Sequence, residues 1–269
     1  MKFVTFQPLR TISIPQVTYI KPEDTLQQLT VIQEADVLLF PEKWQLPILV
    51  DGLHKPIFPS YSSINLGHNK IDMTRALQAI IPDHVPYTEI RGNTDSQAEV
   101  ILSLFPFPFV AKLARSSMGN GVFLIRSHQE FEAYRKCTDT LYIQEYLPSM
   151  KEARICYVGN DIVSSYWKIG EGGQFHHNIA KGGSLSFDAV PKECLDLVRR
   201  VAETLYINHA GFDVLIIDGT PYILEFNVLF GNQGLIKNGQ RLEQVIYEYV
   251  KTTFSTPEPT SPFTGKRIS

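Results

Sequence analysis

The chain has 269 residues, of which 43% are hydrophobic, 11% aromatic and 20% charged. This composition is typical of a globular protein with a substantial core, and it excludes a disordered or fibrous chain. The formal net charge of −3 leaves no basic excess to neutralise a phosphate backbone, so nucleic-acid binding is not expected.

Cysteine usage and hydropathy restrict the cellular setting. Cys137, Cys156 and Cys194 are widely separated and contain no CxxC pair, which disfavours a disulfide framework and a zinc site. Met1–Phe6 leads directly into a strand-like pattern without a charged leader region, and no apolar stretch approaches membrane-spanning length. We therefore expect a cytoplasmic protein with no membrane partner.

The first part of the chain, residues 1–68, predicts a short α/β domain that ends in a loop rich in Ser, Asn and Gly. Its first helix-like segment opens with Glu23 and Asp24, acids that suit a helix N-terminus. The predicted elements are strands at Lys2–Phe6, Asp36–Phe40 and Pro56–Pro59, helices at Pro22–Ala35 and Trp44–Leu53, and the loop Ser60–Asn69.

Two further lobes are predicted, residues 69–148 and 149–254, followed by a Pro/Ser/Thr-rich tail, 255–269, that we expect to be flexible. Asp218-Gly219 is a strong hairpin-turn signal between two apolar runs. The predicted helices run from Lys70 to just before Pro82, over His128–Arg135 and over Pro191–Tyr206. The predicted strands are Tyr87–Ile90, Phe109–Lys112, Val122–Ile125, Leu141–Glu145, Ala153–Val158, Ile162–Lys168, Phe212–Ile217 and Pro221–Phe226.

A loop of small residues separates the strand that ends at Lys112 from the strand that begins at Val122. Gly119 and Gly121 permit positive φ, so several backbone N–H groups can point at one anion while the Lys112 ammonium meets phosphate oxygens. The loop lacks the GxxxxGK[ST] pattern of a Walker loop, and its glycines lead into a strand rather than into the helix of a Rossmann turn. Taken alone, the segment favours the alternative of an ordinary hairpin with an exposed lysine.

The late hairpin carries three oxygen donors. Pairing about Asp218-Gly219 brings Asp213 near Glu225, and Glu225 and Asn227 share strand parity, so their side chains leave the same face. Mg²⁺ prefers such oxygen ligands, together with substrate phosphates. The alternative places these side chains in solvent. Their apolar neighbours indicate a buried sheet instead, where an unpaired carboxylate is costly.

Three segments combine into a recognisable pattern: Pro108–Ile125 (PFVAKLARSSMGNGVFLI), Tyr142–Pro148 (YIQEYLP) and Ala210–Asn227 (AGFDVLIIDGTPYILEFN). In this order and at these separations they resemble the RimK-like and glutathione-synthetase-like branch of the ATP-grasp superfamily. The likeness includes Asn69–Lys70, Arg154–Gly159 and Phe175–Gly183, and it extends from Asn69 to about Gly239. It implies an α/β (α+β) ATP-grasp fold, in which two α+β lobes grip ATP, preceded by a short Rossmann-like unit.

The resemblance also implies roles for individual residues. Lys70 and Lys112 match the two lysines that hold ATP phosphates, and Glu152 matches an acid for the ribose hydroxyls. The other implied nucleotide-binding residues are Ser116, Ser117, Gly119 and Gly121 of the loop, Gln144, Glu145, Tyr146 and Leu147 of the hinge between the lobes, and His176. The implied catalytic residues are Arg154, Lys168, Asn178 and Lys181, and the implied Mg²⁺ ligands are Asp213, Glu225 and Asn227.

The implied activity is that of an ATP-dependent ligase that joins a carboxylate to an amine through an acyl phosphate and releases ADP and phosphate. The implied cofactors are ATP and Mg²⁺, or Mn²⁺ in its place. The expected substrates are small-molecule, amino-acid or peptide carboxylates and amines. Two alternatives stay open, a phosphotransferase that acts on a hydroxyl and a non-catalytic nucleotide-binding regulator. The oligomeric state is equally open, a homodimer included.

Several positions depart from the family pattern or have a simpler explanation. His176 stands where relatives often carry an ATP-contacting arginine, which replaces a fixed charge with one that titrates near neutrality. No proline precedes Gly231 and the N-terminal unit is short, so we expect an altered substrate surface. Adjacent His176 and His177 would point oppositely, which disfavours a zinc site. Without the motif context, Arg154 and Lys168 are most simply solvated strand positions.

Overall fold

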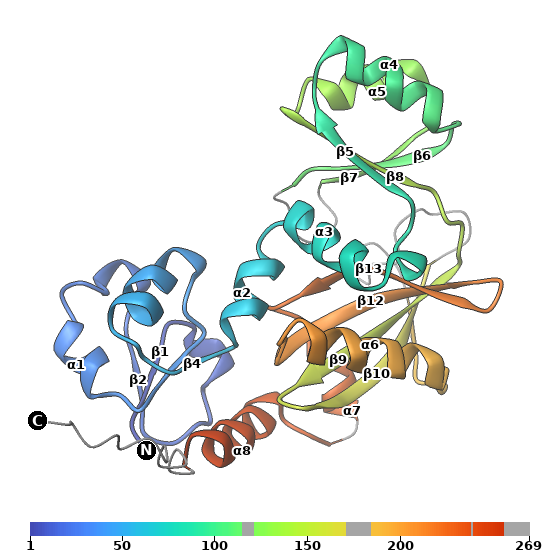
Figure 1. The fold of residues 1–269 in the computed structure, drawn as a ribbon. Helices are drawn as coiled ribbons and strands as arrows, with labels where there is room; N and C mark the ends of the chain where they lie inside the picture. Colours follow the sequence, from blue (N-terminus) through green and yellow to red (C-terminus); the bar gives the residue numbers. More distant parts are fainter. Residues whose placement is uncertain (115–120, 171–183, 238, 256–269) are drawn as a thin grey trace, which may run out of the picture. The chain divides into compact units, whose positions relative to one another are not determined.

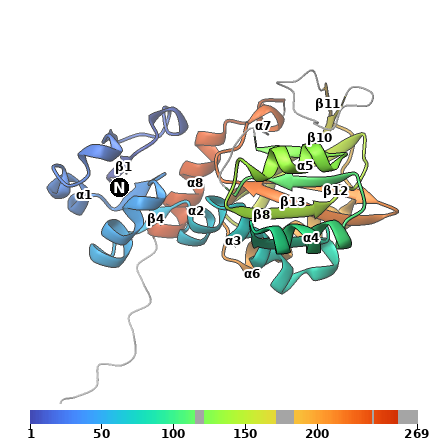
Figure 2. The ribbon, with the colours of Figure 1, turned by 90° about the horizontal axis from the view of Figure 1, so that it is seen from above.

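The computed structural model describes residues 1–114, 121–170, 184–237 and 239–255 (Figure 1). The chain divides into two compact units. One comprises Met1–Phe58 and the described residues from Gln240 onward, and the other comprises Pro59–Gly239. Both mix helices with strands, as Figures 1 and 2 show, so the predicted α+β class is confirmed. No helix in the described part of the chain has both the length and the apolar character needed to cross a membrane.

The first unit is built on a parallel sheet with the strand order β2-β1-β3-β4. Its elements are β1 (Phe3–Thr5), η1 (Pro8–Arg10), β2 (Val17–Tyr19), η2 (Pro22–Asp24), α1 (Leu29–Glu34), β3 (Val37–Leu39), η3 (Lys43–Gln45), the π-helical η4 (Pro47–Gly52), β4 (Ile57–Phe58) and α8 (Leu242–Ser255). Helix α8 belongs here because its aromatic residues pack on the sheet. The ring centroids of Phe3 and Tyr247 are 6.2 Å apart, and those of Phe58 and Tyr249 are 5.7 Å apart.

The second unit contains two sheets. The central lobe has the antiparallel order β5-β8-β6-β7, with α4 and α5 over one face (Figure 1). The C-terminal lobe has the antiparallel order β11-β10-β9-β12-β13, with α6 packed against it. The central-lobe elements are β5 (Thr88–Gly92), α4 (Asp95–Leu104), β6 (Phe109–Lys112), β7 (Val122–Ile125), α5 (His128–Arg135) and β8 (Thr140–Glu145). The other elements of the second unit are α2 (Tyr61–Gly67), α3 (Lys70–Ile80), η5 (Pro82–His84), β9 (Lys151–Val158), β10 (Asp161–Ile169), β11 (Ser184–Ser186), α6 (Lys192–Thr204), β12 (His209–Ile217), β13 (Thr220–Asn227) and α7 (Gln233–Lys237).

Helix α3 connects the two lobes. Its apolar residues Met73 and Leu77 are buried in the core of the C-terminal lobe together with Phe226. Its N-terminus is capped by Asn69, whose side-chain oxygen accepts from Ile71 N at 2.9 Å. The backbone N–H of Lys70 then donates to the backbone oxygen of Ala114, two residues after β6, at 3.1 Å. One helix therefore packs against the C-terminal lobe and is hydrogen-bonded to the central lobe.

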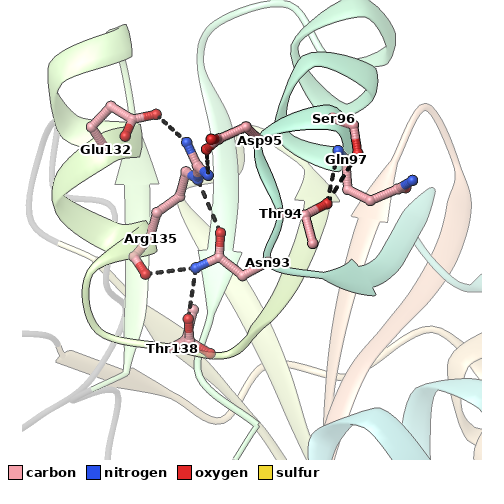
Figure 3. A network of polar contacts seen from close by, with 8 residues as sticks. All are labelled: Asn93, Thr94, Asp95, Ser96, Gln97, Glu132, Arg135 and Thr138. Carbon is pink, nitrogen blue, oxygen red and sulfur yellow. Dashed lines mark hydrogen bonds and ion pairs between the residues drawn. The ribbon is translucent and has the colours of Figure 1, made fainter.

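A polar network fixes the outer end of the central lobe (Figure 3). Asn93, which follows β5, donates from Nδ2 to the backbone oxygens of Arg135 and Thr138, each at 2.7 Å. Arg135 Nε donates back to Asn93 Oδ1 at 3.0 Å, and its terminal nitrogens reach Glu132 and Asp95. Three of these bonds depend on one partly buried amide, so Asn93 ties the β5–α4 connection to the end of α5.

Replacing Asn93 with alanine should lower the free energy of unfolding by about 2 kcal/mol, because backbone oxygens of Arg135 and Thr138 lose their donor. Urea denaturation would measure the loss. Asp95→Ala is the matched control, since it removes an Arg135 partner whose side chain is 96% exposed, and it should leave the midpoint nearly unchanged. Equal losses in the two variants would contradict the role given to Asn93.

Most of the predicted strands and helices are confirmed, but several regions differ. Strands β2 and β11 and helices α7 and α8 were not predicted, and the helix predicted over Trp44–Leu53 is divided between η3 and η4. The predicted loop Ser60–Asn69 is wrong, because helix α2 occupies most of it, capped by Ser60, whose side chain accepts from Ser63 N. The single helix predicted over Pro22–Ala35 is wrong, because η2 and α1 are separate elements. Helix α4 was not predicted, although Thr94 caps it by accepting from Gln97 N.

The predicted domain boundaries after residues 68, 148 and 254 stay a prediction. The compact units divide the chain at Phe58/Pro59 instead, and they group the described residues from Gln240 with the N-terminal strands. Packing of α8 on the first sheet is a long-range contact that no local sequence signal encodes.

Candidate active site

Charged side chains from adjacent strands meet on one face of the five-stranded sheet. The strand register places Asp213 of β12 opposite Arg154 of β9 and opposite Glu225 of β13. Between β9 and β10, Glu152 lies opposite Lys168. Because side chains alternate along a strand, the residues between these charges point to the other face, which is the hydrophobic core.

Asp213 is the centre of this charged group. Arg154 holds its carboxylate with two hydrogen bonds, Nε to Oδ1 at 2.7 Å and Nη2 to Oδ2 at 2.9 Å. The Lys168 ammonium donates to Asp213 Oδ1 at 2.6 Å and to Glu152 Oε1. Asp213 and Lys168 are each only 5% exposed, so these charges interact in a largely dehydrated environment. The alternative of solvated strand positions is therefore wrong for Lys168 and Asp213.

The electrostatic balance keeps the group ionised. Burial alone would raise the pKa of Asp213, but the charges and hydrogen bonds of Arg154 and Lys168 outweigh it and lower that pKa to about 2. For Lys168, burial opposes the charge, yet Asp213 and Glu152 prevail and raise its pKa above the ordinary value. The pKa of Arg154 is raised in the same way, because Asp213 outweighs the effect of burial. The four side chains therefore form an internally neutralised group at ordinary pH.

Lys70, the first residue of α3, brings a further cation to this face. Its Nζ lies 3.5 Å from Glu225 Oε2, and both side chains are largely shielded from solvent. The cap at the N-terminus of α3 and the hydrogen bond from Lys70 N to Ala114 O fix the backbone position of Lys70. Two residues that are far apart in sequence are thus paired, and their roles toward phosphate and metal stay predictions.

Lys112, the last residue of β6, is buried, with only 5% exposure. Burial lowers its pKa, while the negative charges of Glu225, Glu152 and Asp213 act in the opposite direction. Within the described ranges, no carboxylate lies within 4 Å of its ammonium, which instead lies 5.5 Å from the ring centroid of Tyr142. The hairpin alternative with an exposed lysine is therefore wrong.

The donor set on β12 and β13 fits a hard cation. Glu225 and Asn227 leave the same face, with Asn227 Nδ2 donating to Glu225 Oε1 at 3.2 Å, and Glu225 keeps 24% side-chain exposure. Arg154 and Lys168 fill three of the roughly four acceptor positions of the Asp213 carboxylate. In the described part of the chain, no three or more His, Cys, Asp or Glu side chains form a metal-binding group. A cation here would therefore need the amide oxygen and substrate phosphates as well.

The predicted hinge residues lie at the end of β8. Gln144 is buried and donates from Nε2 to Thr88 Oγ1 at 2.8 Å, and Glu145 Oε1 accepts from the backbone of Tyr87 at 2.6 Å. Tyr146 and Leu147 follow the strand without regular secondary structure. The side chains of Gln144 and Glu145 are thus hydrogen-bonded within the central lobe, and the predicted recognition of adenine by backbone groups of this segment stays a prediction.

The remaining predicted residues are placed as follows. Gly121 is described and accepts a backbone hydrogen bond from Leu113 at 2.8 Å. Glu152 is bonded to Lys168, so its predicted contact with a ribose stays a prediction. The predicted residues that lie outside the described ranges are Ser116, Ser117, Gly119, His176, Asn178 and Lys181.

Sequence reasoning missed the tyrosine beside the site. Tyr142 is not among the predicted site residues, yet the structure places it opposite Lys112, with its hydroxyl 2.7 Å from that of Thr74. One signal was available, because Thr74 is a polar residue at helical spacing from Lys70, among the apolar positions of α3.

Comparison with known proteins defines the class. Residues 68–250 match the RimK-like ATP-grasp domain family, which is more than half of the chain. The chain belongs to this family. The predicted resemblance is therefore confirmed.

Individual relatives are more distant. A ribosomal protein bS6–L-glutamate ligase from Salmonella paratyphi B is 29% identical over 174 residues, which span 62% of this chain and 58% of that protein. A RimK-domain ATP-grasp protein from Sphaerobacter thermophilus has a TM-score of 0.69 at 14% identity, over 93% of this chain and 99% of that one. D-alanine–D-alanine ligase from Bacillus anthracis gives 0.68 at 15% identity, over 95% and 98%. These structures confirm the ATP-grasp fold, and the chain matches somewhat over half the length of the bS6 ligase.

Proposed function

We propose that this protein is an ATP-dependent ligase that joins a carboxylate to an amine through an acyl-phosphate intermediate. The observation that carries the proposal is the convergence of Lys70, Lys112, Asp213 and Glu225, four charged residues from separate segments. Lys70 lies 3.5 Å from Glu225, and the charges of Glu225 and Asp213 both act on Lys112. Family membership and the ligase activities named for the relatives support the same reaction class.

The reaction needs activation because a carboxylate is a poor electrophile. In the proposed first step, a carboxylate oxygen attacks the γ-phosphorus of ATP, the bond from that phosphorus to the bridging oxygen breaks, and ADP leaves. In the second step, the amine nitrogen attacks the acyl carbon and loses a proton, and the carbon–oxygen bond to the phosphoryl group breaks. The products are an amide, ADP and phosphate.

The residues of the site suit these steps. Lys70 and Lys112 would hold the phosphate oxygens and offset the charge that develops there. Arg154 and Lys168 are oriented by Asp213 and would meet the reacting carboxylate and the tetrahedral oxyanion. Because these cations are already fixed by buried hydrogen bonds, little reorganisation is needed when negative charge appears.

Glu225, Asn227 and the remaining acceptor position of Asp213 are the residues that would hold Mg²⁺ or Mn²⁺. When bound, such an ion would neutralise phosphate charge and polarise the phosphorus that is attacked. The implied cofactors ATP and Mg²⁺ thus form part of this proposal, and so does a cytoplasmic location, which fits an ATP-consuming enzyme with free cysteines at positions 137, 156 and 194.

The substrates are proposed by chemical class only. One relative is named for adding glutamate to a ribosomal protein and another for joining two D-alanines. We infer that this chain takes its carboxylate and its amine from amino acids, peptides or small molecules.

The test is a screen of acid and amine pairs for ADP release, with mass spectrometry of the products. The expected result is a condensed product that is lighter than the sum of its substrates by one water, formed with equal amounts of ADP and phosphate. A phosphoester without free phosphate would identify a phosphotransferase, and ATP binding without turnover of any pair would identify a regulator. Either outcome would contradict the proposed reaction.

A further inference from the structure

Tyr142 of β8 is a buried aromatic residue beside the predicted phosphate lysine. It is 1% exposed, and the strand register places it directly opposite Lys112 on β6. The Lys112 ammonium lies 5.5 Å from the centroid of its ring, within the range of a cation–π interaction. The ring therefore offers negative electrostatic potential to a cation that has no carboxylate within 4 Å in the described part of the chain.

The orientation of the ring is fixed from the other side. The hydroxyls of Tyr142 and Thr74 share a hydrogen bond of 2.7 Å in a buried environment. Thr74 lies one turn after Lys70 on α3, so the helix that carries one predicted phosphate lysine also holds the aromatic ring beside the other. Burial raises the pKa of Tyr142 to about 12, which keeps its hydroxyl protonated and able to make this bond at neutral pH.

The backbone is held as firmly as the side chains. The Tyr134 hydroxyl accepts from Tyr142 N at 3.0 Å and donates to Lys112 O at 2.9 Å. Tyr134 is itself almost fully buried. Lys112 and Tyr142 are thus fixed both along their strands and at their side chains.

We propose that Tyr142 is a positioning residue for Lys112, and that with Thr74 it aligns the Lys112 ammonium with the triphosphate of ATP. This inference rests on the proposed function. Its physical basis is that a buried ammonium is unfavourable without compensation, and the ring face supplies compensation without forming a salt bridge that phosphate would have to break. The cation stays in place and remains available to a phosphate oxygen.

A double-mutant cycle tests the coupling between Tyr142 and Lys112. The dissociation constant of Mg-ATP is measured by calorimetry, and variants that bind weakly are measured by competition. Tyr142→Leu removes the ring and should weaken binding about tenfold. Tyr142→Phe keeps the ring and should stay within about threefold of the wild type. In a Lys112→Met background, which lacks the cation, Tyr142→Leu should cause almost no further loss.

Tyr157→Leu is the matched control, since it removes another buried tyrosine from the core-facing side of β9. It should lower the melting temperature without changing the dissociation constant. Should Tyr142→Leu fail to fold, Tyr142→Met replaces it, because a flexible thioether fills more of the ring volume. Should binding to a variant fall below detection, the same cycle is measured on the free energy of unfolding in urea.

The outcomes separate the two proposals. If the wild type binds ATP but the losses in binding free energy from the two substitutions simply add in the double variant, only the proposed role of Tyr142 is overturned, and the proposed function stands. Absence of ATP binding by the wild-type protein would overturn the proposed function, and the inference with it.

Discussion

Glu225→Ala is expected to reduce ATP-dependent amide formation about a thousandfold, with the fold intact. Glu225 is the more exposed acid of the pair on β12 and β13, and it faces Lys70 at 3.5 Å. Its loss would remove both a proposed metal ligand and the counter-charge that orients Lys70. Two quantities are measured: the rate at which the condensed product forms, and the Mg²⁺ concentration that supports half-maximal ATP binding.

The matched control is Glu203→Ala, an exposed acid near the end of α6, which should keep full activity. Circular dichroism should be unchanged in both variants, and Glu225→Ala should lower the melting temperature only slightly, because the Glu225 side chain keeps 24% exposure. Retention of normal turnover and of normal Mg²⁺ dependence by the Glu225→Ala protein would contradict its assigned role.

Asp213→Ala is expected to abolish turnover and also to lower the free energy of unfolding by about 3 kcal/mol. The reason is that Arg154 and Lys168 would lose the carboxylate that neutralises them while they remain largely buried. Urea denaturation at neutral pH measures the loss. Asp161→Ala provides the control, since it breaks an ion pair with Arg199 in which the acid is 72% exposed, and it should change stability little.

The same pairing predicts a pH dependence. The pKa of Asp213 in the folded protein, about 2, lies below the value of an unfolded aspartate near 3.9, so its contribution to stability is complete above pH of about 4. That contribution is lost as pH falls from there toward 2. The difference in unfolding free energy between the wild type and Asp213→Asn should therefore shrink as the pH falls from about 4 toward about 2. A constant difference over that range would show that Asp213 is not held ionised by its partners.

Local signals predicted the late hairpin correctly. Asp218 and Gly219 both have positive φ, at 49° and 82°, which is what a tight turn between right-handed twisted strands requires. The turn brings Asp213 near Glu225, and the register shift between Asp213 and Val214 places the two residues directly opposite each other. An irregularity in register between Asp213 and Val214 could not be predicted, because a bulge depends on packing across the sheet.

Other parts of the site depend on long-range pairing. Arg154 meets Asp213 only because β9 lies between β10 and β12, an order that the sequence does not encode locally. Lys112 is buried, with the ring of Tyr142 5.5 Å from its ammonium, whereas its own segment favoured an exposed lysine. The resemblance to a family supplied these residues as candidates, and tertiary structure explains their proximity.

Helix α2 illustrates the limit of composition. Its Ser- and Asn-rich sequence predicted a loop, yet Ser60 acts as an N-cap and also donates to Tyr206 O at 2.7 Å. Ser60 N in turn donates to Asn208 Oδ1 at 2.7 Å, and Ser63 Oγ accepts from Asn208 N at 3.0 Å. The polar side chains are used to dock the helix onto the connection before β12, so tertiary contacts outweigh the local preference for a loop.

The most direct test of the proposed site is a crystal structure with a non-hydrolysable ATP analogue and Mn²⁺, whose anomalous scattering identifies the metal. The account predicts phosphate oxygens within hydrogen-bonding distance of Lys70 and Lys112, and a metal peak beside Glu225 and Asn227. A nucleotide bound elsewhere, or a metal peak remote from β13, would contradict it.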